Sequence, residues 1–310
     1  MSIQEFKIPT PASNPFDIVA EPYPISIIPR FWFTESSARK IGVFQGSGVI
    51  KEYSLPVGNG EPRMIVAGLD GNLYFTEEFD KKIGKITRLG VITEYPITAT
   101  ASFITNGPDG NIWFTEIFAN RVGKFDITTQ TITEYNVGMN TGPITTGSDG
   151  NLWFSSNLSK RINKFSTMGI IIQSYLLLSF VSAITMGPDT NLWFTDEINN
   201  TVGVINTNGI LLATYFIPTI SSSPRSIVTD FSNNLIYFTE FNGNKIGQID
   251  LSGNIVEYDI PTQQSGPLGI TIGFDNNIWF VEKIGDNIGK LNFNISSIPK
   301  SQITFGKCLY

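Results

Sequence analysis

Short apolar runs separated by turns rich in Gly, Asn and Asp fill the chain, and one pair of adjacent aromatic residues recurs seven times. The pairs are Trp32-Phe33, Tyr74-Phe75, Trp113-Phe114, Trp153-Phe154, Trp193-Phe194, Tyr237-Phe238 and Trp279-Phe280, spaced 39 to 44 residues apart. A period of this length with four strand-like runs per copy is typical of a propeller blade. The pattern predicts an all-β fold, a seven-bladed β-propeller of four-stranded blades.

One copy, residues 103–137, shows how a blade is built. Its four expected strands are 103–105, 112–115, 121–126 and 131–137, and Asp109-Gly110 supplies residues that tolerate positive φ in the first hairpin. Adjacent Trp113 and Phe114 point to opposite faces of a strand, so both faces of the blade must be covered, as stacked blades would do. Gly123, in the third strand, leaves room for an aromatic ring over the backbone.

The two ends of the chain suggest how the ring closes. Residues 5–9 repeat the outer-strand motif seen at 94–97, yet they precede the first inner strand, and no such motif directly follows 288–293. We therefore predict that the N-terminal strand completes the last blade and removes two exposed edges at once. Residues 1–293 form the expected single propeller, and 294–310 remain as a C-terminal tail.

Composition and charge narrow the possible partners. The net charge is −6 without any basic run, so nucleic acid is not expected as a partner. The longest apolar segment, 170–181, is interrupted by polar residues, so no membrane span is expected. The N-terminus lacks the pattern of a signal peptide, which favours a protein that is intracellular or part of a larger particle.

The phrases at 107–116 (GPDGNIWFTE), 121–125 (RVGKF) and 132–135 (ITEY), with counterparts along nearly the whole chain, resemble the virginiamycin B lyase family. The resemblance implies a propeller that acts as a metal-assisted lyase. Members of that family use magnesium to open the ester ring of streptogramin B antibiotics by elimination.

The positions that carry the family's activity differ in this chain. The resemblance places the two catalytic histidines at Arg225 and Leu268, and the glutamate before the second histidine at Gly266. Glu282 lies one residue off the register of the family's metal-binding glutamate and is the candidate ligand for a divalent cation, Mg or Ca. The chain has no histidine, and a general base near pH 7 is most easily made from imidazole. We expect no lyase activity.

Two sets of residues are candidates for a site at the mouth of the channel. The first set is a ring of acids that follow the aromatic pairs and could hold a cation; these acids are Glu35, Glu77, Glu116, Asp196, Glu240 and Glu282. Because they recur in six of the seven repeats, a scaffold role explains them better. In that role each carboxylate would accept loop N–H groups or pair with Lys40, Lys82 or Arg121. The second set breaks the repeat where the inner strands begin. There Arg63 and Arg225 could grip an anion, with Phe16 and Leu268 as apolar wall. The alternative is that each arginine pairs with a nearby acid such as Glu61 or Asp230.

These observations leave three functional interpretations. The first is a virginiamycin B lyase-like propeller that is non-catalytic, a pseudoenzyme acting as a binding or structural module for a protein or a small anionic ligand. The others are a divergent metal-dependent lyase of the streptogramin B type and a lactone hydrolase whose metal is held by carboxylates and Asn. No cofactor is firmly implied.

Overall fold

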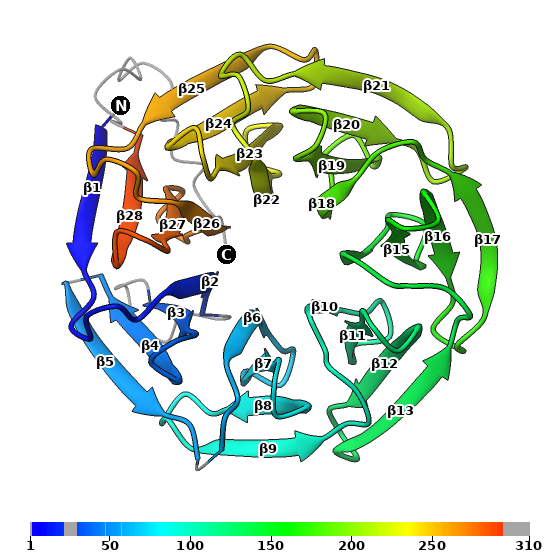
Figure 1. Ribbon diagram of the computed structural model, residues 1–310, viewed down its shortest axis with the longest axis horizontal. Helices are drawn as coiled ribbons and strands as arrows, with labels where there is room; N and C mark the ends of the chain where they lie inside the picture. Colours follow the sequence, from blue (N-terminus) through cyan, green and yellow to red (C-terminus); the bar gives the residue numbers. More distant parts are fainter. Residues whose placement is uncertain (1, 22–29, 47, 57, 294–310) are drawn as a thin grey trace, which may run out of the picture.

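The computed structural model describes residues 2–21, 30–46, 48–56 and 58–293, and all elements in these ranges are β-strands. Seven antiparallel sheets of four strands each stand around a central channel (Figure 1). The predicted all-β, seven-bladed propeller is thereby confirmed. The described ranges contain no helix that is long and apolar enough to cross a membrane.

Blades 1 to 6 each use four consecutive strands, numbered from the channel outward, whereas blade 7 takes its outermost strand from the N-terminus. The strands are β2 (Pro15–Ala20), β3 (Arg30–Glu35), β4 (Lys40–Gln45) and β5 (Val49–Ser54) in blade 1; β6 (Pro62–Ala67), β7 (Leu73–Glu77), β8 (Lys82–Ile86) and β9 (Ile92–Pro96) in blade 2; β10 (Phe103–Asn106), β11 (Ile112–Glu116), β12 (Arg121–Asp126) and β13 (Thr131–Asn136) in blade 3; β14 (Ile144–Thr146), β15 (Leu152–Ser156), β16 (Arg161–Phe165) and β17 (Ile171–Leu176) in blade 4; β18 (Val181–Met186), β19 (Leu192–Asp196), β20 (Thr201–Ile205) and β21 (Leu211–Phe216) in blade 5; β22 (Pro224–Asp230), β23 (Leu235–Glu240), β24 (Lys245–Asp250) and β25 (Ile255–Asp259) in blade 6; and β26 (Pro267–Ile272), β27 (Ile278–Glu282), β28 (Asn287–Asn292) and β1 (Ser2–Lys7) in blade 7.

The first hairpin of blade 3 shows why its sequence recurs. Gly110 has a φ of +79°, as the Asp-Gly turn predicts. The carboxylate of Asp109 accepts hydrogen bonds from the backbone N–H of Asn111 at 3.2 Å and from Nε1 of Trp113 at 2.9 Å. The turn therefore satisfies the only polar atom of a fully buried indole, and the same Asp–Trp bond occurs in blades 4, 5 and 7.

The aromatic pair joins neighbouring blades because its two members face opposite ways. Trp113 packs into the apolar cluster of blade 4, and Phe114 packs into the cluster that blade 3 shares with blade 2. The Phe114 ring lies over Gly123 on the adjacent strand, where a Cβ atom would come within 2.1 Å of the ring. The predicted role of the third-strand glycine is confirmed.

The N-terminal strand closes the ring as predicted. β1 pairs antiparallel with β28, from Ser2 opposite Asn292 to Lys7 opposite Asn287, and the two strands lie side by side in Figure 1. The carboxylate of Glu5 also accepts hydrogen bonds from the backbone N–H and the hydroxyl of Thr262 in blade 6, at 2.9 and 3.1 Å. We call this pair of hydrogen bonds from one threonine to one glutamate a clip. Three other junctions between neighbouring blades have the same clip, with the pairs Thr10–Glu52, Thr98–Glu134 and Thr219–Glu257. The predicted tail, 294–310, lies outside the described residues.

Candidate functional site

The inner strands of all seven blades line a cavity of about 400 Å³ in the central channel. Its lining includes all four residues that the sequence singles out at the channel, namely Phe16, Arg63, Arg225 and Leu268. We call these four residues the channel mouth. The volume is within the range of about 300–1,000 Å³ that is usual for small-molecule pockets.

A β-bulge positions each residue of the channel mouth. The inner strands of blades 1, 2, 6 and 7 begin with a proline, and the pairing register then shifts before the next isoleucine, as between Pro62 and Ile65. The two bulged residues re-aim their side chains toward the channel. In blade 2 the extra backbone N–H, that of Met64, donates to Oγ1 of Thr76 at 3.2 Å. The threonine of the recurring Phe-Thr-Glu motif thus supports the bulge, as Thr34 and Thr239 do in blades 1 and 6.

The arginines at the channel mouth form ion pairs, but with other acids than those named from the sequence. Nε of Arg63 pairs with Oε2 of Glu78 in the same blade. Nη1 of Arg225 lies 2.8 Å from Oε2 of Glu197, which belongs to the neighbouring blade. The alternative that each arginine pairs with a nearby acid is therefore observed, with Glu78 and Glu197 in place of Glu61 and Asp230. The carboxylate of Asp230 instead accepts the backbone N–H groups of its own turn.

A third cation lies beside the two arginines. The Lys283 ammonium is 5.5 Å and the Arg63 guanidinium 5.0 Å from the centre of the Phe16 ring, both within cation–π range. Burial, followed by the charges of Arg63 and Arg225, lowers the pKa of Lys283. Each guanidinium uses one nitrogen for its ion pair, and its other N–H groups have no acceptor among the described residues. Three cations with free donors therefore gather at one end of the channel, together with the carboxylates Glu78, Glu197 and Glu61.

Four residues of this arrangement were not found from the sequence: Glu78, Glu197, Phe241 and Lys283. Each directly follows the acid that ends the second strand of its blade. Arg225 lies 5.8 Å from the centre of the Phe241 ring, so all four contact a residue of the channel mouth. The variation at this position from blade to blade is the signal that could have identified them.

Asp17 is a fifth residue that sequence reasoning missed. It occupies the bulge next to Phe16, lines the cavity and is only 7% exposed. Burial raises its pKa to about 7, although hydrogen bonds from the backbone N–H groups of Ile65 and Ile18 oppose the rise. Gly269, in blade 7, allows the close approach, because a Cβ atom there would lie 2.4 Å from the Asp17 Cα. A carboxyl group that titrates near neutral pH is thus part of the channel wall.

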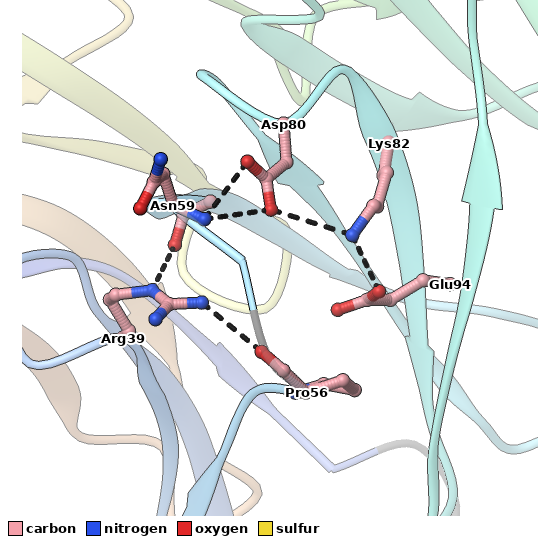
Figure 2. Close-up of polar contacts among 7 residues, drawn as sticks. Arg39, Pro56, Asn59, Asp80, Lys82 and Glu94 are labelled. Carbon is pink, nitrogen blue, oxygen red and sulfur yellow. Dashed lines mark hydrogen bonds and ion pairs between the residues drawn. The ribbon is translucent and has the colours of Figure 1, made fainter.

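The acids that follow the aromatic pairs lie inside the blades and not in a ring at the channel mouth. All six are buried, and none lines the cavity. Lys82 bonds to Glu94 in the outer strand at 2.7 Å and to Asp80 at 3.4 Å (Figure 2). The carboxyl oxygens of Glu77 have no hydrogen-bond partner among the described residues. Likewise Lys40 bonds to Glu52, so the expected pairing of these lysines with the second-strand acids is wrong. Arg121, the third expected partner, does pair with its second-strand acid, Glu116, at 3.8 Å.

This burial changes the pKa values of the second-strand glutamates. Burial, with the nearby outer-strand carboxylate Glu52, raises the pKa of Glu35 to about 8. Its two carboxyl oxygens have no hydrogen-bond partner among the described residues. Equivalent glutamates in four other blades have a pKa of about 7 (Glu77 and Glu116) or about 8 (Glu240 and Glu282), in each case chiefly through burial.

The residues at the channel mouth do not fit the magnesium ion that the family uses. Mg²⁺ needs oxygen ligands, whereas the positions of the family's two histidines present a guanidinium (Arg225) and an aliphatic chain (Leu268), and Lys283 brings an ammonium beside them. Glu282, the candidate ligand, is fully buried in blade 7 and accepts a hydrogen bond from Nδ2 of Asn287 at 2.9 Å. Within the described residues, no three His, Cys, Asp or Glu side chains are grouped closely enough to hold a metal ion.

Comparison with known proteins agrees with the propeller fold. The sequence profile described as the virginiamycin B lyase family matches residues 2–142 and 104–300. A solved streptogramin B lyase structure is 35% identical, with a TM-score of 0.85 over 94% of this chain and 98% of that chain. Two structures of virginiamycin B lyase from Staphylococcus aureus are 33% identical over 94% of this chain and 99% of each of theirs, with a TM-score of 0.85; one is a catalytically inactive variant with quinupristin. No curated protein sequence matches. The chain belongs to the virginiamycin B lyase family.

Proposed function

We propose that this chain is a non-catalytic member of the family that binds a small anionic ligand at the channel mouth. The observation that carries the proposal is the convergence of Arg63, Arg225 and Lys283 on one end of the channel, in a molecule whose net charge is −6. The free N–H groups of the two guanidiniums suit a carboxylate, sulfonate or phosphate group.

The same residues argue against the family's elimination reaction. The guanidinium of Arg225 remains protonated and cannot accept a proton, and the Leu268 side chain has no polar atom. Gly266, at the position of the family's glutamate, has no side chain and a φ of +62°. These three positions therefore supply no base, and Glu282, the candidate metal ligand, is buried inside blade 7.

A second candidate function rests on Asp17. Its carboxyl has a pKa of about 7 and lines the cavity, which are the properties expected of a general base near neutral pH. A divergent lyase built on Asp17 would therefore lose its activity in an Asp17→Asn variant. We favour the binding function because backbone N–H groups already bond to the Asp17 carboxylate, at 2.9 Å in the case of Ile65.

Thermal unfolding with malonate, a small dicarboxylate, tests the binding function. Malonate should raise the melting temperature above that in sodium chloride of equal ionic strength, because a ligand that binds the folded state stabilises it. The double variant Arg63→Ala/Arg225→Ala should lose this increment, whereas Arg161→Ala, which removes an exposed arginine at the outer strands of blade 4, should keep it. Equal increments in all three proteins would contradict the proposal.

A further inference from the structure

A second cavity adjoins the channel mouth and runs over blades 3, 4 and 5. Its volume is about 380 Å³, similar to that of the channel cavity. Four residues, Phe103, Pro143, Ser182 and Arg225, line both cavities, so the two spaces adjoin. We call the second cavity the side groove.

The side groove is lined by large apolar side chains that are open to solvent. Phe118 is 84% exposed, Leu158 is 86% exposed and Phe180 is 38% exposed. Phe118 and Leu158 lie on the loops that follow β11 and β15, and Phe180 lies just before β18. Exposed apolar side chains gathered around one concavity are typical of a binding site for an apolar group.

Hydrogen bonds hold the wall of the side groove in place. The side-chain amide of Asn157 both donates to the carbonyl of Val181 at 3.0 Å and accepts from its N–H at 3.1 Å. The N–H of Phe180 donates to the buried Asp196 carboxylate at 3.0 Å. The groove is therefore largely pre-formed, which lowers the entropic cost of binding.

Charge is distributed unevenly between the two cavities. Arg63 and Lys283 lie on the side of blades 7, 1 and 2, whereas the groove lining from blades 3 and 4 is uncharged and that from blade 5 carries Glu197, the ion-pair partner of Arg225. Arg225 lies where the cavities meet, and its side chain is 44% exposed. A ligand that reaches both cavities thus meets the Arg225–Glu197 ion pair at their boundary, where the guanidinium keeps N–H groups that are not used by Glu197, and apolar side chains beyond it.

We infer that the ligand is an amphipathic anion, with a carboxylate or sulfonate at Arg225 and an aromatic or alkyl body in the side groove. The inference rests on the proposed binding function and adds the chemical class of the ligand. A purely hydrophilic anion such as malonate would occupy only the charged part of the site.

Titration with 1-anilinonaphthalene-8-sulfonate, a fluorescent aromatic sulfonate, tests this inference on the full chain. We expect one bound probe per chain and competition by decanoate but not by acetate. Leu158→Ser and Phe118→Ser should each weaken binding at least tenfold. Phe79→Ser is the matched control and should change affinity less than twofold, because Phe79 occupies the same loop position in blade 2, is 61% exposed and lines neither cavity.

The variants separate this inference from the proposed function. Loss of binding in Arg63→Ala/Arg225→Ala but not in the two groove variants would overturn the amphipathic ligand and leave anion binding intact. Weakening by the groove variants alone would show a site for neutral apolar groups and contradict both. Equal effects of all three serine variants would mean that the probe binds exposed apolar side chains at random, which would also overturn the inference. Unchanged unfolding curves of the serine variants should confirm that each remains folded.

Discussion

Nη1 of Arg225 lies 2.8 Å from Oε2 of Glu197, and this ion pair joins blade 6 to blade 5. The sequence resemblance places the family's first catalytic histidine at Arg225. A charged pair lies in its place, and that pair borders both the channel mouth and the side groove.

Restoring the family's residues should fail to restore the reaction. In Arg225→His/Leu268→His/Gly266→Glu, a glutamate would have to adopt a φ of +62°, with its Cβ 3.0 Å from the Ile284 side chain. We expect a loss of at least about 1 kcal/mol of stability from residue 266 alone, and no opening of a streptogramin B ring with magnesium. Chemical denaturation and a product assay check the two parts. The double histidine variant without Gly266→Glu is the control for the strain.

Stability should fall as the pH rises from about 4.5 to 8. Glu35, Glu240 and Glu282 have a pKa of about 8, and Glu77 and Glu116 of about 7, against 4.5 in the unfolded chain. The folded protein therefore keeps protons that the unfolded chain has released in this window. Each such proton changes the free energy of unfolding by about 1.4 kcal/mol per pH unit. Urea unfolding at pH 5.5 and 8.5 measures the difference.

Glu35→Gln should reduce the fall in the free energy of unfolding per pH unit, because the amide does not titrate. The neighbouring carboxylate Glu52 should act in the opposite direction. Burial alone would raise the pKa of Glu52, but hydrogen bonds from Lys40 and Thr10 lower it. Glu52 therefore contributes stability that is present above pH 4.5 and is lost at lower pH. Constant stability between pH 5.5 and 8.5 would show that the buried glutamates are ionised in the folded protein.

Removal of residues 1–9 should strongly destabilise the ring. The deletion removes β1 and the Glu5–Thr262 clip, and it exposes the edge of β28 to pairing with other chains. We expect aggregation or a large drop in melting temperature. Removal of 294–310 is the control and should have a smaller effect because it leaves all 28 described strands in place. Identical melting of the shortened and full-length proteins would contradict closure by β1.

Two glycine substitutions should separate packing from backbone strain. Gly123→Ala would place a Cβ 2.1 Å from the Phe114 ring, so we expect overpacking to cost about 1–3 kcal/mol or more. Gly150 has a φ of +71°, and a Cβ added there would have no neighbouring atom within 4 Å, so Gly150→Ala should cost about 1–2 kcal/mol from strain alone. Urea unfolding compares them. A smaller loss for Gly123→Ala would contradict the stacking of the phenylalanine on the glycine.

The scaffold was predictable because its determinants repeat. The Trp113-Phe114 pair, the Asp109 turn and Gly123 act locally and identically in most blades, and the displaced motif at residues 5–9 identified the closing strand. The site was only partly predictable. Arg63 and Arg225 were found because they break the repeat, but their partners Glu78 and Glu197 come from loops whose approach only the folded ring fixes.

The register at the end of the second strand explains why the residues after the repeated acids were missed. Adjacent residues point to opposite sides, so Glu77 is buried in the blade while Glu78 reaches the channel mouth. The sequence pattern drew attention to the repeated acid, whereas the variable residue after it contacts the site. Lys283, next to Glu282, follows the same rule.

The most direct test of the account is incubation with quinupristin and magnesium between pH 6 and 9, with the state of the ester ring read by mass spectrometry. The account predicts that the ring stays intact, because Arg225, Leu268 and Gly266 supply neither a base nor a metal ligand. Ring opening that disappears in Asp17→Asn or Glu282→Gln would contradict the account and show that the chain is a lyase whose site has been rebuilt from other residues.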